Sequence, residues 1–224
     1  MITVVATASC ISPPAPLAPA VSPQDIVHKL APGAIEFAGY GGYQKPISTT
    51  SEAAQKWFDR GIQLVYGFNH DAAVHAFARA AQEDPECAMA WWGIAYSYGV
   101  DVNNPDVSEL EAQYANVAIN EAIRLKANAT PAELSLIDAA AFRAVYPLPE
   151  DRTEIDLSYS QAMSRAWDAH QDDPDIGAMY AESLMNMQRW DYWGADGEPL
   201  GNTEELLSVL DDAMALNNFH PGAN

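Results

Sequence analysis

Histidine and cysteine are the residues here whose chemistry is most distinctive, because both can bind transition metals. The chain has five histidines and two cysteines. His70 follows Asn69, which we expect to cap a helix, so the helix dipole disfavours protonation and leaves a neutral, ligand-competent imidazole. Cys87 and His70 cannot bind the same ion, because the seventeen helical residues that separate them span roughly 25 Å. His75 lies about 140° around the same helix and is excluded as well.

His220, in the terminal HPGAN segment, is the second candidate ligand. It can join His70 at a transition metal only if the fold brings the two histidines together, which would make a metal-binding module or a metalloenzyme. The alternative for His70 is an ordinary hydrogen bond at a helix end. No other cofactor is predicted.

The acidic loops 101–106 and 191–205 offer oxygen ligands for calcium. Neither has the register of an EF-hand, so we expect solvated loops. The chain also lacks GxSxG, HExxH and a phosphate-binding loop, so no nucleophile and base can be paired. These absences favour binding over catalysis.

The charge balance limits the partners. Lys and Arg total 11 against 31 Asp and Glu, a formal net charge of −20. Such a surface repels nucleic acids and anionic lipids, and it favours cationic partners or serves solubility alone. No apolar run is long enough to span a membrane.

These candidates depend on helices that must position them, and the sequence repeats with a period of 34 residues. Three positions of one helix return after this interval: Trp57 as Trp91, Gly61 as Ala95, and Leu64 as Tyr98. Between them, a second helix carries an answering stripe and a closing proline: Ala73, Phe77, Ala80 and Pro85. This is the tetratricopeptide (TPR) pattern, in which each helix pair buries its faces by stacking on the next.

The predicted fold is therefore all-α: a right-handed α-solenoid of about four TPR-like helix pairs with an irregular N-terminal arm. The expected pairs are 49–67 with 70–84, 86–99 with 106–127, 131–145 with 153–171, and 174–190 with 202–217. The expected regions are a signal remnant or tether (1–24), an irregular segment packed on the repeats (25–48), the repeats (49–217) and a C-terminal tail (218–224). An ordinary helical bundle is the alternative.

The N-terminal arm suggests export. Residues 1–24 contain no charged side chain, and they resemble the end of a signal segment followed by a proline-rich tether. Ala8-Ser9-Cys10 resembles a bacterial lipoprotein box, in which Cys10 would be lipidated. The alternative is a disordered linker with an incidental cysteine.

Two blocks resemble a family of exported bacterial TPR proteins. They are FDRGIQLVYGFNHDAAVHAFARAAQEDPECAMAWWGIAYSYG (58–99) and RWDYWGADGEPLGNTEELLSVLDDAMALNNFHPGAN (189–224), of which the phrases GFNH and CAMAWWG are the most specific. Similar proteins continue past HPGAN into histidine-rich helices. The resemblance thus implies an N-terminal part, a periplasmic, lipid-anchored or extracellular location, and no particular chemistry.

The repeat rule also predicts a binding groove. The first helix of each TPR pair lines the concave surface, and the inward positions are Phe58, Ile62, Tyr66, Trp92 and Tyr96. An aromatic wall in an acidic molecule suits a peptide or a cationic ligand. The alternative is that the N-terminal arm or residues 25–48 fill this groove.

Three functions follow from the sequence. The first is a scaffold that binds a peptide or protein partner in the groove. The second is the metal site of His70 and His220, completed by chain absent here. The third is self-assembly into homo-oligomers through uncapped terminal helices.

Overall fold

The computed structural model describes residues 21–36, 38–39 and 41–224. Its regular elements are all helical: α1 (Pro23–Leu30), η1 (Ala31–Gly33), α2 (Glu52–Tyr66), α3 (His70–Glu83), α4 (Ala88–Ser97), α5 (Glu109–Leu125), η2 (Lys126–Asn128), α6 (Pro131–Arg143), α7 (Thr153–Ala169), α8 (Pro174–Met187) and α9 (Thr203–Leu216). Cys10 and residues 1–20 of the predicted signal remnant or tether lie outside the described residues.

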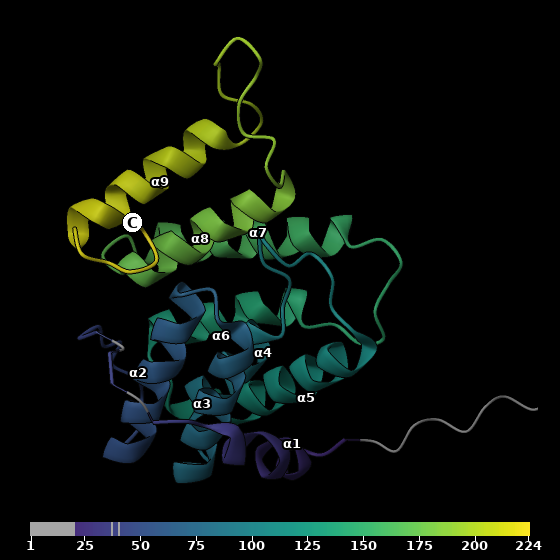
Figure 1. Ribbon diagram of the computed structural model, residues 1–224, viewed down its shortest axis with the longest axis vertical. Coiled ribbons are helices and arrows are strands. Elements are labelled where there is room, and N and C mark those ends of the chain that lie inside the picture. The colour runs from purple at the N-terminus through teal and green to yellow at the C-terminus, as the bar shows by residue number, and fades with distance from the viewer. Residues whose placement is uncertain (1–20, 37, 40) are drawn as a thin grey trace, which may run out of the picture.

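Consecutive helices form pairs, and the pairs stack (Figure 1). The closest packing joins α2 with α3, α4 with α5, α6 with α7, and α8 with α9, while α3–α4 and α7–α8 contacts link successive pairs. All eight predicted helices are present, with ends that differ by only a few residues from those expected. The all-α prediction is confirmed, and the packing is that of stacked pairs in an α-solenoid.

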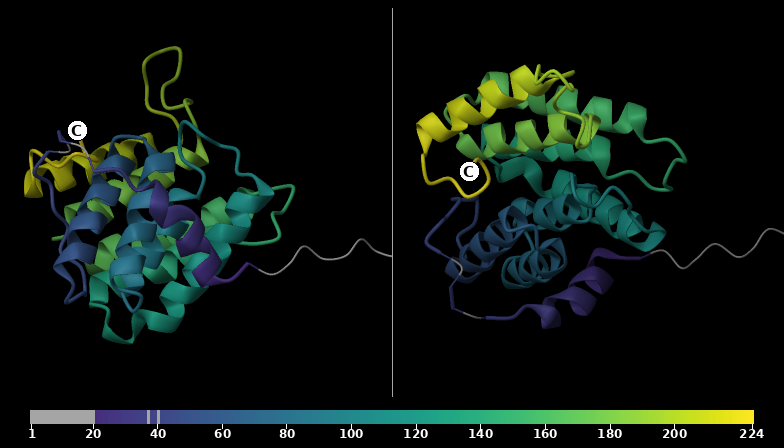
Figure 2. Two further views of the ribbon diagram at one scale, coloured as in Figure 1. Left: turned by 60° about the horizontal axis from the view of Figure 1, so that its bottom comes forward. Right: turned by 45° about the horizontal axis from the view of Figure 1, so that its top comes forward.

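Helix α1 is an addition to the expected fold, because residues 25–48 were predicted to be irregular. Ser22 and Asp25 form a capping box around Pro23, so the first turn is stabilised by both side chains. Ile26 and Leu30 are buried, and α1 packs against α3 and α5. Figure 2 shows α1 along the outer side of the first helix pairs. We call residues 25–48 the arm, and the first part of this segment is thus helical.

The remainder of the arm runs irregularly across the first helices, as expected. The Ser48 backbone N–H donates to Glu133 at 2.6 Å, which ties the arm to α6. Tyr43 and Lys45 reach α8 through hydrogen bonds to Asp175. The arm therefore connects the first half of the stack to the second.

Helix α2 begins three residues later than the expected start at residue 49. Ser51 is the N-cap, and its hydroxyl accepts a hydrogen bond from the Ala54 N–H. The Thr49 hydroxyl instead donates to Asp84 at 2.5 Å. Because Ser51 immediately precedes the first helical residue, it is better placed than Thr49 to accept hydrogen bonds from the free N–H groups of the first turn.

Phe77 of α3 explains why two glycines lie in the facing helices. A Cβ atom on Gly61 would lie 2.5 Å from Phe77 Cε1, and one on Gly93 would lie 2.3 Å from Phe77 Cδ1. The ring of Phe58 completes the contact, with a centroid distance of 5.2 Å. Helices α2 and α4 can approach this ring closely only because both positions lack a side chain.

We expect Gly93→Ala to destabilise the protein. The methyl group must displace the Phe77 ring at a cost of about 1–3 kcal/mol, which exceeds the roughly 0.5–1 kcal/mol that alanine gains in a helix. Urea unfolding followed by circular dichroism measures the difference. The matched control is Gly67→Ala, where the nearest atom would be 3.4 Å from the new Cβ. A Gly93→Ala protein as stable as wild type would contradict this close packing.

Candidate functional site

The predicted groove residues are mostly in the core. Phe58 and Ile62 are 0% exposed, Trp92 is 1% exposed and Tyr96 is 5% exposed. The prediction that Phe58, Ile62 and Trp92 line an open groove is therefore wrong, whereas Tyr96, although largely buried, borders a pocket described below. Tyr66 is half-buried.

Packing between the first helices of successive pairs accounts for this burial. Helix α4 contacts α2 and α6 as well as its own partner α5. The Trp92 indole N–H donates to the Leu136 carbonyl of α6 at 3.1 Å, and its ring stacks on Tyr96 with a centroid distance of 5.1 Å. Trp91 is buried too, so the tryptophan doublet belongs entirely to the core.

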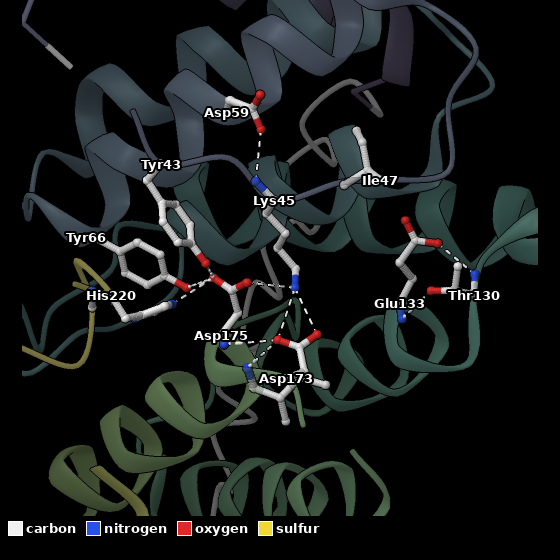
Figure 3. Close-up of polar contacts among 12 residues, drawn as sticks. Tyr43, Lys45, Ile47, Asp59, Tyr66, Thr130, Glu133, Asp173, Asp175 and His220 are labelled. Carbon is white, nitrogen blue, oxygen red and sulfur yellow. Dashed lines mark hydrogen bonds and ion pairs between the residues drawn. The ribbon is translucent and has the colours of Figure 1, made fainter. Parts of the chain in front are cut away.

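A buried ionic cluster lies where the second half of the stack faces the first (Figure 3). The Asp175 carboxylate accepts hydrogen bonds from Tyr43 at 2.7 Å, from Lys45 at 2.9 Å and from Tyr66. The His220 ring lies 3.2 Å from the same carboxylate through Nε2. We call this group the Asp175 cluster, which comprises Tyr43, Lys45, Tyr66, Asp173, Asp175 and His220.

Local structure positions the central carboxylates. Asp173 caps α8 by accepting hydrogen bonds from the backbone N–H groups of Asp175 and Ile176. Pro174 begins the helix, so Asp175 lies in the first turn, where the helix dipole stabilises a negative charge. Lys45 Nζ also contacts Asp173 at 3.1 Å.

The Asp175 cluster is ionised. Burial opposes a charge on Asp175, but the hydrogen bond from His220 and the charge of Lys45 outweigh it and hold the pKa of Asp175 below its usual range. Burial also opposes the charge of Lys45, yet the carboxylates of Asp175 and Asp173 raise its pKa. Burial and the charge of Asp175 raise the pKa of Tyr66 well above its usual value, so its hydroxyl remains a donor.

The two predicted metal ligands have separate partners. His220 is fully buried, and its Nδ1 accepts a hydrogen bond from the Gly222 N–H, so Nε2 carries the proton donated to Asp175. His70 Nδ1 instead lies 3.3 Å from Asp101. Among the residues that the structure describes, no group of three or more His, Cys, Asp and Glu side chains could hold a metal ion. The structure thus does not join His70 and His220 at one site.

A pocket of about 270 Å³ adjoins the Asp175 cluster, and we call it the concave pocket. Its lining comes from α2, α3, α4, α6, α8, α9, the loop after α4 and the C-terminal segment. The apolar lining includes Val65, Phe68, Val102, Met179, Met185 and Leu210, and the polar lining includes His70, Tyr96, Asp101, Arg143 and Glu182. Tyr66 lines it as well, so three predicted site residues, Tyr66, His70 and Tyr96, meet here.

Arg143 and Glu182 form the charged part of the concave pocket. The guanidinium of Arg143 lies between the rings of Tyr96 and Tyr159, at 4.8 and 4.7 Å from their centroids. It donates to the Val100 carbonyl, and its Nη1 is 3.5 Å from Glu182 Oε2. Burial raises the pKa of Glu182, although Arg143 opposes this.

His70 and Asp101 form the other polar pair. Asp101 accepts hydrogen bonds from the backbone N–H groups of Asn103 and Asn104, so the loop 101–106 turns inward at its first residue. This corrects the expectation that the whole loop is solvated, because Asp101 is buried. Burial lowers the pKa of His70, with Asp101 opposing, so the imidazole is neutral at pH 7.

Sequence reasoning missed Lys45, Asp175, Arg143 and Glu182. Arg143 and Glu182 are charged residues within apolar stretches of α6 and α8. A lone charge on an apolar helix face signals a buried polar partner, and this is the only signal that could have found them.

Comparison of the chain with protein-family models, curated proteins and solved structures finds no match. The resemblance to exported bacterial TPR proteins thus rests on its quoted motifs alone. Within the described residues, none of the helices has the length and apolar character needed to cross a membrane.

Replacing Asp175 tests whether the Asp175 cluster stabilises the folded state. Asp175→Asn leaves Lys45 buried beside a single carboxylate, and breaking a buried pair typically costs about 3–5 kcal/mol. We expect a loss of that order in urea unfolding. The control is Asp138→Asn, which removes the exposed ion pair with Lys126 and should change stability little. Equal effects of the two substitutions would contradict a structural role for the cluster.

The effect of Asp175→Asn on the free energy of unfolding should depend on pH. The folded-state pKa of Asp175 is lowered, so its stabilisation is complete above the unfolded pKa of about 3.9 and is lost as pH falls towards the folded value. The stability difference between wild type and Asp175→Asn should be constant above about pH 5 and shrink by about 1 kcal/mol by pH 3. Urea midpoints across this range measure it, and a constant difference down to pH 3 would refute the assignment.

Proposed function

We propose that the protein is a helical-repeat binding protein whose ligand occupies the concave pocket. The observation that carries the proposal is a partly enclosed, largely apolar cavity whose lining includes a few charged side chains, the usual composition of a ligand site. The 34-residue period supports a right-handed, TPR-type stack. The absence of charged side chains from residues 1–24 supports export.

The enclosure and apolar lining of the concave pocket, rather than its size, favour a ligand. Larger pockets of about 570 Å³ are present elsewhere, but they are more open and more polar. Helices from both halves of the stack surround the concave pocket, as is common for binding sites between packed units. We therefore expect a ligand with an apolar part that enters the pocket, either a small molecule or a side chain of a peptide.

Self-association stays a separate prediction. The exposed apolar side chains near the last helix pair are the ones it would use: Trp190, Trp193, Leu216 and Phe219. The metal-site alternative gains no support, because both ring nitrogens of His220 form hydrogen bonds within the protein: Nε2 with Asp175 and Nδ1 with the Gly222 N–H.

Filling the pocket tests the proposed function. We expect Met185→Trp to abolish binding of a neutral aromatic probe, naphthalene-2-carboxamide, because Met185 lines the cavity. Isothermal titration calorimetry and saturation-transfer NMR measure the binding.

The matched control is Met187→Trp, which adds the same ring on α8 at an exposed position and should leave binding unchanged. The proposal fails if wild-type protein does not bind this naphthalene probe. Binding that survives Met185→Trp would also refute it.

A further inference from the structure

His70 brings an unused ring nitrogen to the concave pocket. The residue lines this pocket, and 18% of its side chain is exposed. Its Nδ1 lies 3.3 Å from Asp101 Oδ2. Within the described part of the chain, Nε2 forms no hydrogen bond, yet it is not one of the buried polar atoms that lack a partner. Nε2 therefore has accessible surface, and it is the polar atom of His70 that a ligand can reach.

Asp101 determines which nitrogen of His70 carries the proton. Its Oδ1 accepts hydrogen bonds from the backbone N–H groups of Asn103 and Asn104, at 2.8 and 2.9 Å, so Oδ2 is left for the imidazole. A carboxylate only accepts hydrogen bonds, so the proton of the neutral imidazole lies on Nδ1. Burial lowers the pKa of His70 and keeps the ring neutral at pH 7. Nε2 is therefore a hydrogen-bond acceptor.

The charged side chains of the concave pocket are directed into the protein. Arg143 is 3% exposed, and its Nη2 donates to the Val100 carbonyl while its Nε and Nη1 are buried. Glu182 accepts a hydrogen bond from Asn186 through Oε1, and its Oε2 is buried at 3.5 Å from Arg143 Nη1. Both oxygens of Asp101 have partners as well. A charged ligand would lose its hydration here without gaining an ion pair, so the pocket favours a neutral ligand.

The apolar lining favours an aromatic ligand. Tyr66, Phe68 and Tyr96 contribute rings to the concave pocket, and Met179 and Met185 contribute thioether groups. Aromatic rings pack against one another in offset or edge-to-face arrangements, and methionine sulfur makes favourable contacts with ring edges. A flat aromatic body therefore gains more here than an aliphatic chain of the same size.

We propose that the concave pocket binds a neutral phenol whose hydroxyl donates a hydrogen bond to Nε2 of His70. This inference rests on the proposed function, since it assigns the ligand class of the same pocket. His70 is the residue that touches the hydroxyl. Asp101 is a positioning residue, because it holds the imidazole and keeps its proton on Nδ1. A phenolic O–H supplies the donor that Nε2 lacks, and its ring supplies the apolar body.

Calorimetry with two naphthalene probes tests the assignment. They are 2-naphthol, whose hydroxyl can donate, and 2-methoxynaphthalene, whose ether oxygen can only accept. We expect wild-type protein to bind 2-naphthol about fivefold more tightly, the factor that corresponds to one hydrogen bond between neutral groups. Nitrogen NMR of the imidazole should show the His70 proton on Nδ1.

His70→Asn removes the acceptor and keeps a donor for Asp101. The asparagine amide N–H can replace Nδ1–H, whereas no atom takes the place of Nε2. We expect the affinity for 2-naphthol to fall about fivefold, to that of 2-methoxynaphthalene, whose own affinity should be unchanged. The matched control is His28→Asn, the same substitution at an exposed position of α1, which should leave both affinities unchanged. Circular dichroism verifies that each variant is folded.

Asp101→Asn tests the positioning role of Asp101. The amide oxygen can still accept from the backbone N–H groups of Asn103 and Asn104, which turns the amide N–H towards His70 Nδ1. A donor at this place moves the imidazole proton to Nε2. The affinity for 2-methoxynaphthalene should then rise about fivefold and approach that for 2-naphthol, because the ether oxygen can accept from Nε2–H. Nitrogen NMR should show the same move of the proton.

The outcomes separate the phenol assignment from the pocket itself. Equal binding of the two probes by wild-type protein overturns the hydrogen bond to His70, and so does an imidazole proton found on Nε2 of the wild type. A preference for 2-naphthol that survives His70→Asn overturns it as well. If neither probe binds but naphthalene-2-carboxamide does, the phenol assignment alone fails. Absence of binding by all three compounds overturns the proposed function itself.

Discussion

The carboxylate of Asp175 is the contact on which the arrangement of the two halves depends. In a stack of helix pairs, each pair mainly contacts its neighbours, so the first and last pairs need another connection. Asp175 supplies it by accepting hydrogen bonds from Lys45 of the arm and Tyr66 of α2 while His220 of the C-terminal segment approaches the same oxygens. Figure 2 shows that segment between the last helix pair and the first helices. The concave pocket lies among α8, α2 and α4, so it depends on the spacing of these helices that the Asp175 contacts maintain.

An ionic contact suits this task better than apolar packing would. Desolvation cancels much of the attraction between buried charges, so such a pair adds little net stability compared with well-packed apolar residues. Its energy nevertheless depends strongly on geometry, because a displaced partner leaves a buried charge unpaired. Lys45 is fixed from both directions, since its backbone N–H donates to Asp59 and its Nζ contacts two carboxylates. The cluster therefore favours one spacing of the two halves.

Local sequence patterns were sufficient for the helices and insufficient for the site. The 34-residue period and its recurring positions led to eight expected helices, all of which are present, and they placed Gly61 and Phe77 on facing helices that pack closely. The capping box of Ser22 and Asp25 was readable as well, although α1 was not predicted. The groove was misjudged because the repeat rule assigns faces to helices but does not fix how closely successive helices pack. The hydrogen bonds that Lys45 and Tyr66 make to Asp175 span 130 and 109 residues, beyond any periodic signal.

The acidic exterior and the apolar lining of the concave pocket act on a ligand over different distances. A net charge of −20 repels anions at long range and slows their approach, and salt at 0.1 M screens this repulsion beyond about 10 Å. The contacts inside the pocket are screened far less, because protein rather than water surrounds them. Small hydrophilic anions gain nothing from the apolar lining that would offset the repulsion. A ligand with an apolar body gains the buried surface along α8 and α9, so the pocket and the surface charge together favour ligands with an apolar body.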